Sequence, residues 1–86
     1  MKIRIALYGA LREAEASGHV ELEVPAGSRI AELRDLLAAH LREHAPAISA
    51  GLVRRSAFAS TEEILHNHRA VPEGVELAVL PPVSGG

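Results

Sequence analysis

The sequence predicts a single α+β domain in which one long helix packs across one face of a mixed β-sheet. Two segments near the N-terminus and one near the C-terminus alternate apolar with polar residues, which is the pattern of half-buried strands. Between them, apolar residues recur at helical spacing from position 30 to position 41. A chain of 86 residues is long enough for one hydrophobic core, so these segments are expected to share it.

The N-terminal third of the chain predicts a strand hairpin. Residues 2–8 alternate, residues 10–16 favour one or two helical turns, and residues 19–24 alternate again until Pro25. The side chains expected on the buried faces of these two strands are Ile3, Ile5, Leu7, Val20, Leu22 and Val24.

The long helix is predicted to begin after Ser28, whose hydroxyl can cap the free N–H groups of a helix start. Its apolar stripe is expected to consist of Ile30, Leu33, Leu37 and Leu41. Pro46 ends the helix, because proline has no N–H and the residue before it avoids the helical conformation. Residues 47–52 predict a connection that can include another short helical turn.

Short strands are expected within residues 55–59 and near 64–65, and a clearer one at 75–80 after a Pro-Glu-Gly turn. A hairpin, one long helix and then short strands fit the β-grasp arrangement. In that arrangement the first and last strands lie side by side and parallel at the centre of the sheet. We therefore expect a β-grasp domain over residues 1–80 and a flexible, extended C-terminal tail over residues 81–86.

The composition argues against several classes of function. A net charge of −2, with one Tyr and one Phe, offers little for phosphate contacts or base stacking, so no nucleic-acid partner is expected. The adjacent pair Arg54 and Arg55 is assigned to a solvated loop. No apolar run approaches the roughly 20 residues of a membrane span, and the N-terminus lacks a signal-peptide pattern, so we expect a cytoplasmic protein without membrane contact. Because the chain contains no cysteine, any sulfur that it handles must be held by another group.

The C-terminal tail combines an extended path with a terminal carboxylate that can be activated. Its residues are Pro81, Pro82, Val83, Ser84, Gly85 and Gly86. The two prolines end the sheet, and six extended residues reach about 20 Å, enough to thread a channel in another protein. Gly85 and Gly86 have no Cβ and fit a narrow channel. The Gly86 carboxylate, once joined to AMP, becomes a mixed anhydride that a sulfur nucleophile can attack to leave a thiocarboxylate.

The sequence from Leu80 to Gly86 resembles the C-terminal signature of the molybdopterin synthase small subunit, a MoaD-type sulfur carrier of the MoaD/ThiS ubiquitin-like family. Residues 8–12 are similar to the start of that family, and residues 73–76 to its acidic turn before the last strand. Two departures are the Ala-Phe-Ala-Ser-Thr segment at 57–61, where the family commonly has a Val-Asn pair, and Val75 in place of an aspartate.

This resemblance implies a carrier that is not catalytic alone and binds no cofactor. An E1-like enzyme would adenylate Gly86 with ATP, a sulfur donor would convert the adenylate to a thiocarboxylate, and the large subunit of molybdopterin synthase would receive the tail. Sulfur would then pass to cyclic pyranopterin monophosphate in molybdenum cofactor biosynthesis. Docking requires an apolar patch near the tail, for which the candidates are Phe58, Ala78 and Leu80.

Two histidine patterns have the spacing of metal ligands. Residues 40–44 match the H-x-x-E-H pattern of zinc proteases, but a catalytic zinc needs a third protein ligand and a cleft that so small a domain cannot build. His66 and His68 would lie on one side of a strand, and two ligands do not make a specific site. No metal site is therefore expected.

Three other functions fit the same tail. A ubiquitin-like modifier would be activated at Gly86 in the same way and end in an isopeptide bond to a target lysine. A sulfur carrier of another pathway, such as thiamine synthesis, would share the thiocarboxylate, although the Pro-Pro-Val-Ser ending favours molybdopterin. A plain interaction module with a passive tail would tolerate trimming of the tail.

Overall fold

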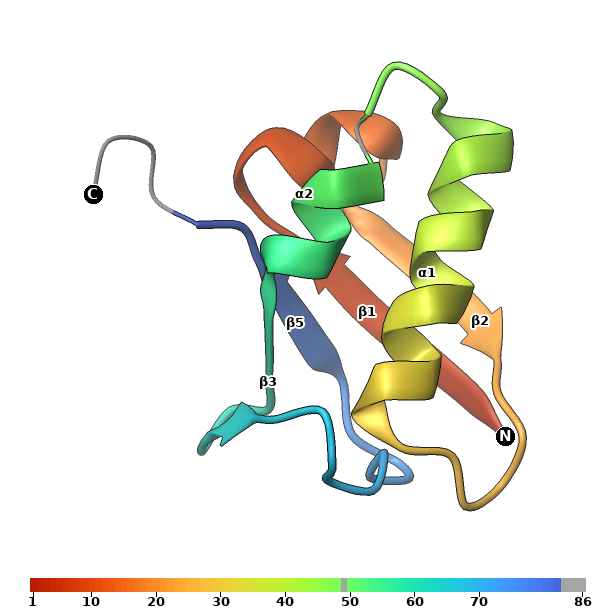
Figure 1. The fold of residues 1–86 in the computed structure, drawn as a ribbon, viewed down its shortest axis with the longest axis vertical. Helices are drawn as coiled ribbons and strands as arrows, with labels where there is room; N and C mark the ends of the chain where they lie inside the picture. The colour runs from red at the N-terminus through yellow and green to blue at the C-terminus, as the bar shows by residue number, and fades with distance from the viewer. Residues whose placement is uncertain (49, 83–86) are drawn as a thin grey trace.

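In the computed structural model, which describes residues 1–48 and 50–82, two helices cover one face of a five-stranded sheet (Figure 1). The strands are β1 (Lys2–Leu7), β2 (His19–Glu23), β3 (Ala57–Ala59), β4 (Ile64–Leu65) and β5 (Leu77–Leu80). The helices are α1 (Ile30–His44), α2 (Ala50–Arg55) and the 3₁₀ helix η1 (Gly9–Ala14). No helix in the described ranges is long and apolar enough to cross a membrane.

The sheet has the order β2-β1-β5-β3-β4. The first and last strands, β1 and β5, are parallel neighbours, and the other pairs are antiparallel. This confirms the predicted β-grasp arrangement with a mixed sheet and one long helix packed across it. The last strand begins at Leu77, two residues later than expected, and Val75 before it is exposed.

The core lies between the sheet and the two α-helices. The predicted stripe of α1 is fully buried, since Ile30, Leu33, Leu37 and Leu41 are each at most 1% exposed. It packs on the inward residues of β1 and β5, among them Ile5 and Leu77. The helix has Ala45 as its C-cap residue, immediately before Pro46 as predicted.

Two local predictions were wrong. Ser28 does not cap α1, because its buried hydroxyl donates instead to the carbonyl oxygen of Pro25 at 2.6 Å. The N-cap residue is Arg29, whose backbone N–H donates to the Glu32 carboxylate at 2.8 Å. Arg54 and Arg55 lie in the last turn of α2 rather than in a loop, although both are exposed as expected.

Candidate tail exit and docking face

The chain leaves the sheet from one of its central strands. Pro81 directly follows β5 and is half-buried, whereas Pro82 is exposed. Proline has no N–H to donate, so Pro81 cannot extend the hydrogen-bonded ladder of β5. The predicted tail residues Val83, Ser84, Gly85 and Gly86 lie outside the described residues.

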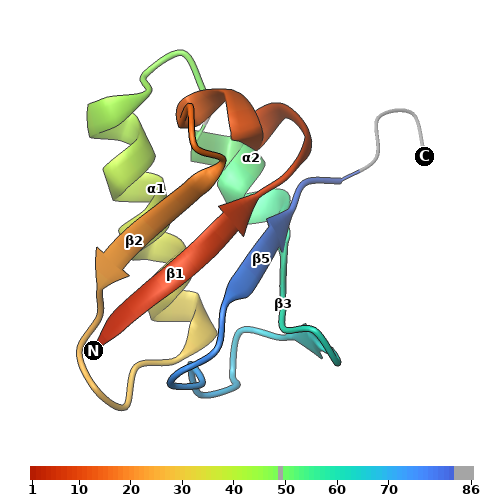
Figure 2. The ribbon, with the colours of Figure 1, turned by 180° about the vertical axis from the view of Figure 1, so that it is seen from behind.

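No described element covers the face of the sheet turned away from α1 and α2 (Figure 2). The residues at the centre of this face are apolar. Strand register places Ala6 beside Ala78, Ala78 beside Ala59, and Ala59 beside Ile64, so that one row crosses four strands. Leu80 lies on the same face one step nearer the tail and pairs with Ala57. The central side chains are methyl groups that project only a short distance from the sheet, so a partner surface can approach the strands closely.

Charged side chains border one side of this alanine row. The Glu76 carboxylate is 2.9 Å from Arg4 Nε and 3.6 Å from His19 Nε2. Beside them is a hollow of about 210 Å³, lined in part by Ala6, Ala78 and the exposed Tyr8. An apolar centre with a polar margin is the usual anatomy of a protein–protein interface.

Of the three docking candidates predicted from sequence, two lie on the uncovered face and one lies in the core. Ala78 is half-buried on the uncovered face, and Leu80 is 36% exposed there. Phe58 is not a surface residue: it is fully buried, because its position in β3 pairs with the inward Val79, and that register turns its ring towards the helices. Sequence reasoning missed Ala6 and Ala59, although their alternation with the apolar Ile5 and Phe58 was a usable signal.

A second, larger hollow of about 420 Å³ lies next to the β4 edge, between Ser60–Glu63 and the segment from Arg69 to Glu76. Its Glu63 carboxylate accepts a hydrogen bond from Arg69 at 2.8 Å, and this bond lowers the pKa of Glu63. A carboxylate held in this way is a poor proton acceptor, so Glu63 is not suited to act as a general base at neutral pH.

The histidine pairs do not form a metal centre. The rings of His40 and His44 stack with centroids 4.2 Å apart, and those of His66 and His68 are 6.5 Å apart. Within the part of the chain that the structure describes, no group of three His, Cys, Asp or Glu side chains could hold a metal ion. Burial, and after it the charge of His44, lowers the pKa of His40.

The mixed sheet, the helix across one face and the free apolar face define a ubiquitin-like β-grasp domain. The ThiS family model matches residues 5–86, and the chain belongs to this family. The chain is also similar to the crystal structure of SAMP1 from Haloferax volcanii, with 26% identity and a TM-score of 0.70 over 100% of both chains.

A second structure, of H. volcanii small archaeal modifier protein 1, shares the fold, with 24% identity and a TM-score of 0.66 over 95% of this chain and 98% of that one. No curated protein matches the chain.

Proposed function

We propose that this chain is the sulfur-carrying subunit of a molybdopterin synthase, with Gly86 as the residue that holds the sulfur. The observation that supports the proposal is the place where the chain leaves the sheet. The central strand β5 passes from an uncovered apolar face directly into Pro81 and Pro82, and the sequence then continues as Val-Ser-Gly-Gly. A partner that binds the face would therefore also receive the tail.

The proposed chemistry has two steps before transfer. An oxygen of the Gly86 carboxylate attacks the α-phosphorus of ATP, and pyrophosphate leaves, so that an acyl-adenylate forms. A sulfur nucleophile at the oxidation level of sulfide then attacks the acyl carbon, and the bond to AMP breaks, so that the carboxylate has exchanged one oxygen for sulfur with no change of oxidation state. If the donor is a persulfide, an acyl disulfide forms instead, and a thiol reductant must cleave its S–S bond to leave the thiocarboxylate. Transfer to cyclic pyranopterin monophosphate requires the acids and bases of the large synthase subunit, because this small domain does not wall off a cavity of its own.

The uncovered face is the proposed docking surface for both the E1-like adenylating enzyme and the large subunit. Leu80 and the half-buried Ala78 would contact these partners directly, whereas Ala6 and Ala59, which are only 6% and 7% exposed, form the floor of the same face. The small side chains give close approach, and Leu80 adds an exposed anchor beside the tail.

Intact mass spectrometry after incubation with ATP, an E1-like enzyme and a sulfur source tests the proposal. We expect replacement of one oxygen by sulfur, mapped to Gly86. Deletion of Gly86, or addition of one residue after it, should abolish loading without changing the thermal unfolding midpoint. Absence of loading under conditions that load an authentic carrier would refute the proposal. Gly85→Trp should load and unfold normally but fail to transfer sulfur, because a large side chain cannot thread a narrow channel.

A second candidate is a ubiquitin-like modifier, which is favoured by the similarity to SAMP1, a protein described as a small archaeal modifier. The activation step is the same, but a lysine amine displaces AMP and forms an isopeptide bond. The product separates the two functions: lysine-linked adducts of Gly86 in cells favour a modifier, and a free thiocarboxylate favours a carrier. Sulfur delivered to the thiazole of thiamine rather than to the pterin would assign the carrier to the thiamine pathway.

A further inference from the structure

The start of the tail rests against a glycine that is 72 positions away in the sequence, since Pro81 packs on Gly9. The parallel register pairs Leu7 with Val79, and two residues further along each strand come Gly9 and Pro81. At Gly9 the chain turns out of the sheet into η1 with a φ of +58°. The end of β1 therefore supplies the surface that the chain meets as it leaves β5.

The contact has no room for a side chain on Gly9. A Cβ at this position would lie 2.7 Å from Pro81 Cγ and 3.6 Å from its Cδ, whereas ordinary contact begins near 3.4 Å. The proline ring would have to move by about 0.7 Å, the difference between 3.4 and 2.7 Å, or the backbone of η1 would have to shift. Pro81 has a closed ring and cannot turn aside as a flexible side chain can.

We propose that Gly9 is a positioning residue that sets the direction in which the tail leaves the domain. This rests on the proposed function, in which a partner binds the uncovered face and receives the tail at the same time. Two prolines in succession favour one extended path, so a displacement at Pro81 is passed on to the residues that follow. The direction of the chain at Pro81 and Pro82 is thus set relative to Leu80 and the alanine row, and a partner's channel can be placed to meet it there.

Because Gly9 has a positive φ, two substitutions are needed to separate backbone strain from the clash with Pro81. Gly9→Ala adds both backbone strain and the clash with Pro81, whereas Gly9→Asn adds the clash with less strain because Asn tolerates left-handed angles. Gly74→Ala is the matched control, since Gly74 has a φ of +73° and a Cβ there would have nothing within 4 Å. Pro81→Ala removes the ring atoms that the clash requires.

The test compares the variants Gly9→Ala, Gly9→Asn, Gly74→Ala and Pro81→Ala, and the double variant Gly9→Asn with Pro81→Ala. The first measurement is the rate of sulfur transfer from loaded protein to the acceptor at a fixed concentration of partner. Misplacement on the order of 1 Å can cost up to about 100-fold in rate, so for Gly9→Asn we expect about a tenfold loss, with less than about twofold for Gly74→Ala. In the Pro81→Ala background, Gly9→Asn should cause no additional loss.

A second measurement does not depend on sulfur chemistry. In the wild type, NMR should show close contacts between the Gly9 Hα atoms and the Pro81 ring, and the signals of Pro82 should shift in Gly9→Asn but not in Gly74→Ala. Wild-type protein that shows these contacts but never loads sulfur would refute the proposed function and leave the positioning role standing. Unchanged transfer in a folded Gly9→Asn variant, or an equal loss in the Pro81→Ala background, would overturn the positioning role.

Discussion

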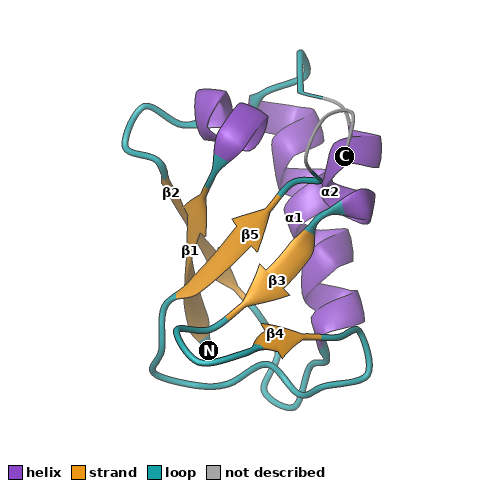
Figure 3. Ribbon diagram, turned by 90° about the vertical axis from the view of Figure 1, so that its left-hand side faces the viewer, coloured by secondary structure: helices purple, strands orange, loops and turns teal. Residues whose placement is uncertain are grey.

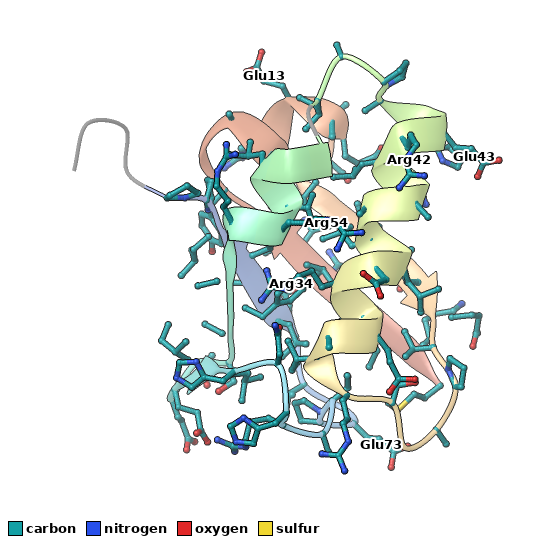
Figure 4. All side chains as sticks on the ribbon, in the orientation of Figure 1. Glu13, Arg34, Arg42, Glu43, Arg54 and Glu73 are labelled. Carbon is teal, nitrogen blue, oxygen red and sulfur yellow. The ribbon has the colours of Figure 1, made fainter. Side chains whose placement is uncertain are left out.

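Replacing Arg34 should destabilise the packing of α2 and β3 against α1 more than replacing any exposed arginine. Its guanidinium lies between α1, α2 and the segment that leads into β3 (Figure 4). Nη1 donates to the carbonyl oxygen of Val53 at 2.9 Å and to that of Ser56, and Nε donates to Asn67 Oδ1 at 3.1 Å. The guanidinium carbon also lies 4.9 Å from the centre of the Phe58 ring.

The expected loss follows from these contacts. Each bond from a charged donor to a carbonyl contributes about 1.5 kcal/mol at the low end, and the ring contact about 0.5 kcal/mol. Burial also lowers the pKa of Arg34, so part of this gain is offset by the cost of desolvating the charge. We expect Arg34→Met, which keeps the aliphatic stem, to lower the free energy of unfolding by about 2 kcal/mol, or the unfolding midpoint by about 8–16 °C.

Thermal and urea unfolding of the purified chain measure this effect. The matched control is Arg54→Met, since among the described residues Arg54 makes one ion pair, 3.3 Å from Asp35, with both side chains more than half exposed. That pair should contribute about 0–0.5 kcal/mol. Arg34→Lys should resemble Arg34→Met, because an ammonium group cannot reproduce the planar fork of donors. Equal midpoints for Arg34→Met and Arg54→Met would refute this reasoning.

Three further predictions concern the surface. Leu80→Asp should weaken binding to an E1-like partner about tenfold or more, whereas Leu36→Asp on α1 should not. The two leucines are 36% and 38% exposed, but only Leu80 lies on the uncovered sheet face. Equal effects of the two substitutions in a binding titration would argue against the docking face. If the chain acts as a modifier, any polymer of its own copies should be linked through Lys2, its one lysine. The other amine, at the N-terminus, is a poorer acceptor because it already donates a hydrogen bond to Val24 O at 2.7 Å. Lys2→Arg should therefore abolish such polymers, and their persistence on a gel would contradict this. The lowered pKa of His40 means that the unfolded chain binds more protons just below the ordinary value of 6.5, so stability is full above that pH and falls as the pH drops towards the folded pKa. Urea titrations from about pH 7.5 to about 5.5 should show a smaller loss for His40→Gln than for the wild type, and identical losses would exclude His40 as the source.

The uncovered face could be predicted only in part. Residues 57–59 contain one large apolar side chain between two alanines, and that pattern does not say which side of the strand faces the helices. The pairing of Phe58 with Val79 decides it: Phe58 points into the core, and Ala57 and Ala59 point to the opposite face of the sheet, where Ala57 is half-buried and Ala59 is only 7% exposed. The prediction that Ser28 caps the helix was wrong for a similar reason, because its hydroxyl donates to the carbonyl oxygen of Pro25 in the preceding turn.

Local patterns determined the first two strands, the long helix with its end at Pro46, and the proline exit at residues 81–82, since each depends on the spacing of side chains or on the backbone of one residue type. Tertiary structure alone decided which strands are neighbours: β5 lies between β1 and β3, as Figure 3 shows. It thereby gathered Ala6, Ala59 and Ala78 into one row and placed Pro81 on Gly9. These contacts join segments up to 72 residues apart, and they form only when the whole core closes, so no local pattern in the chain records them.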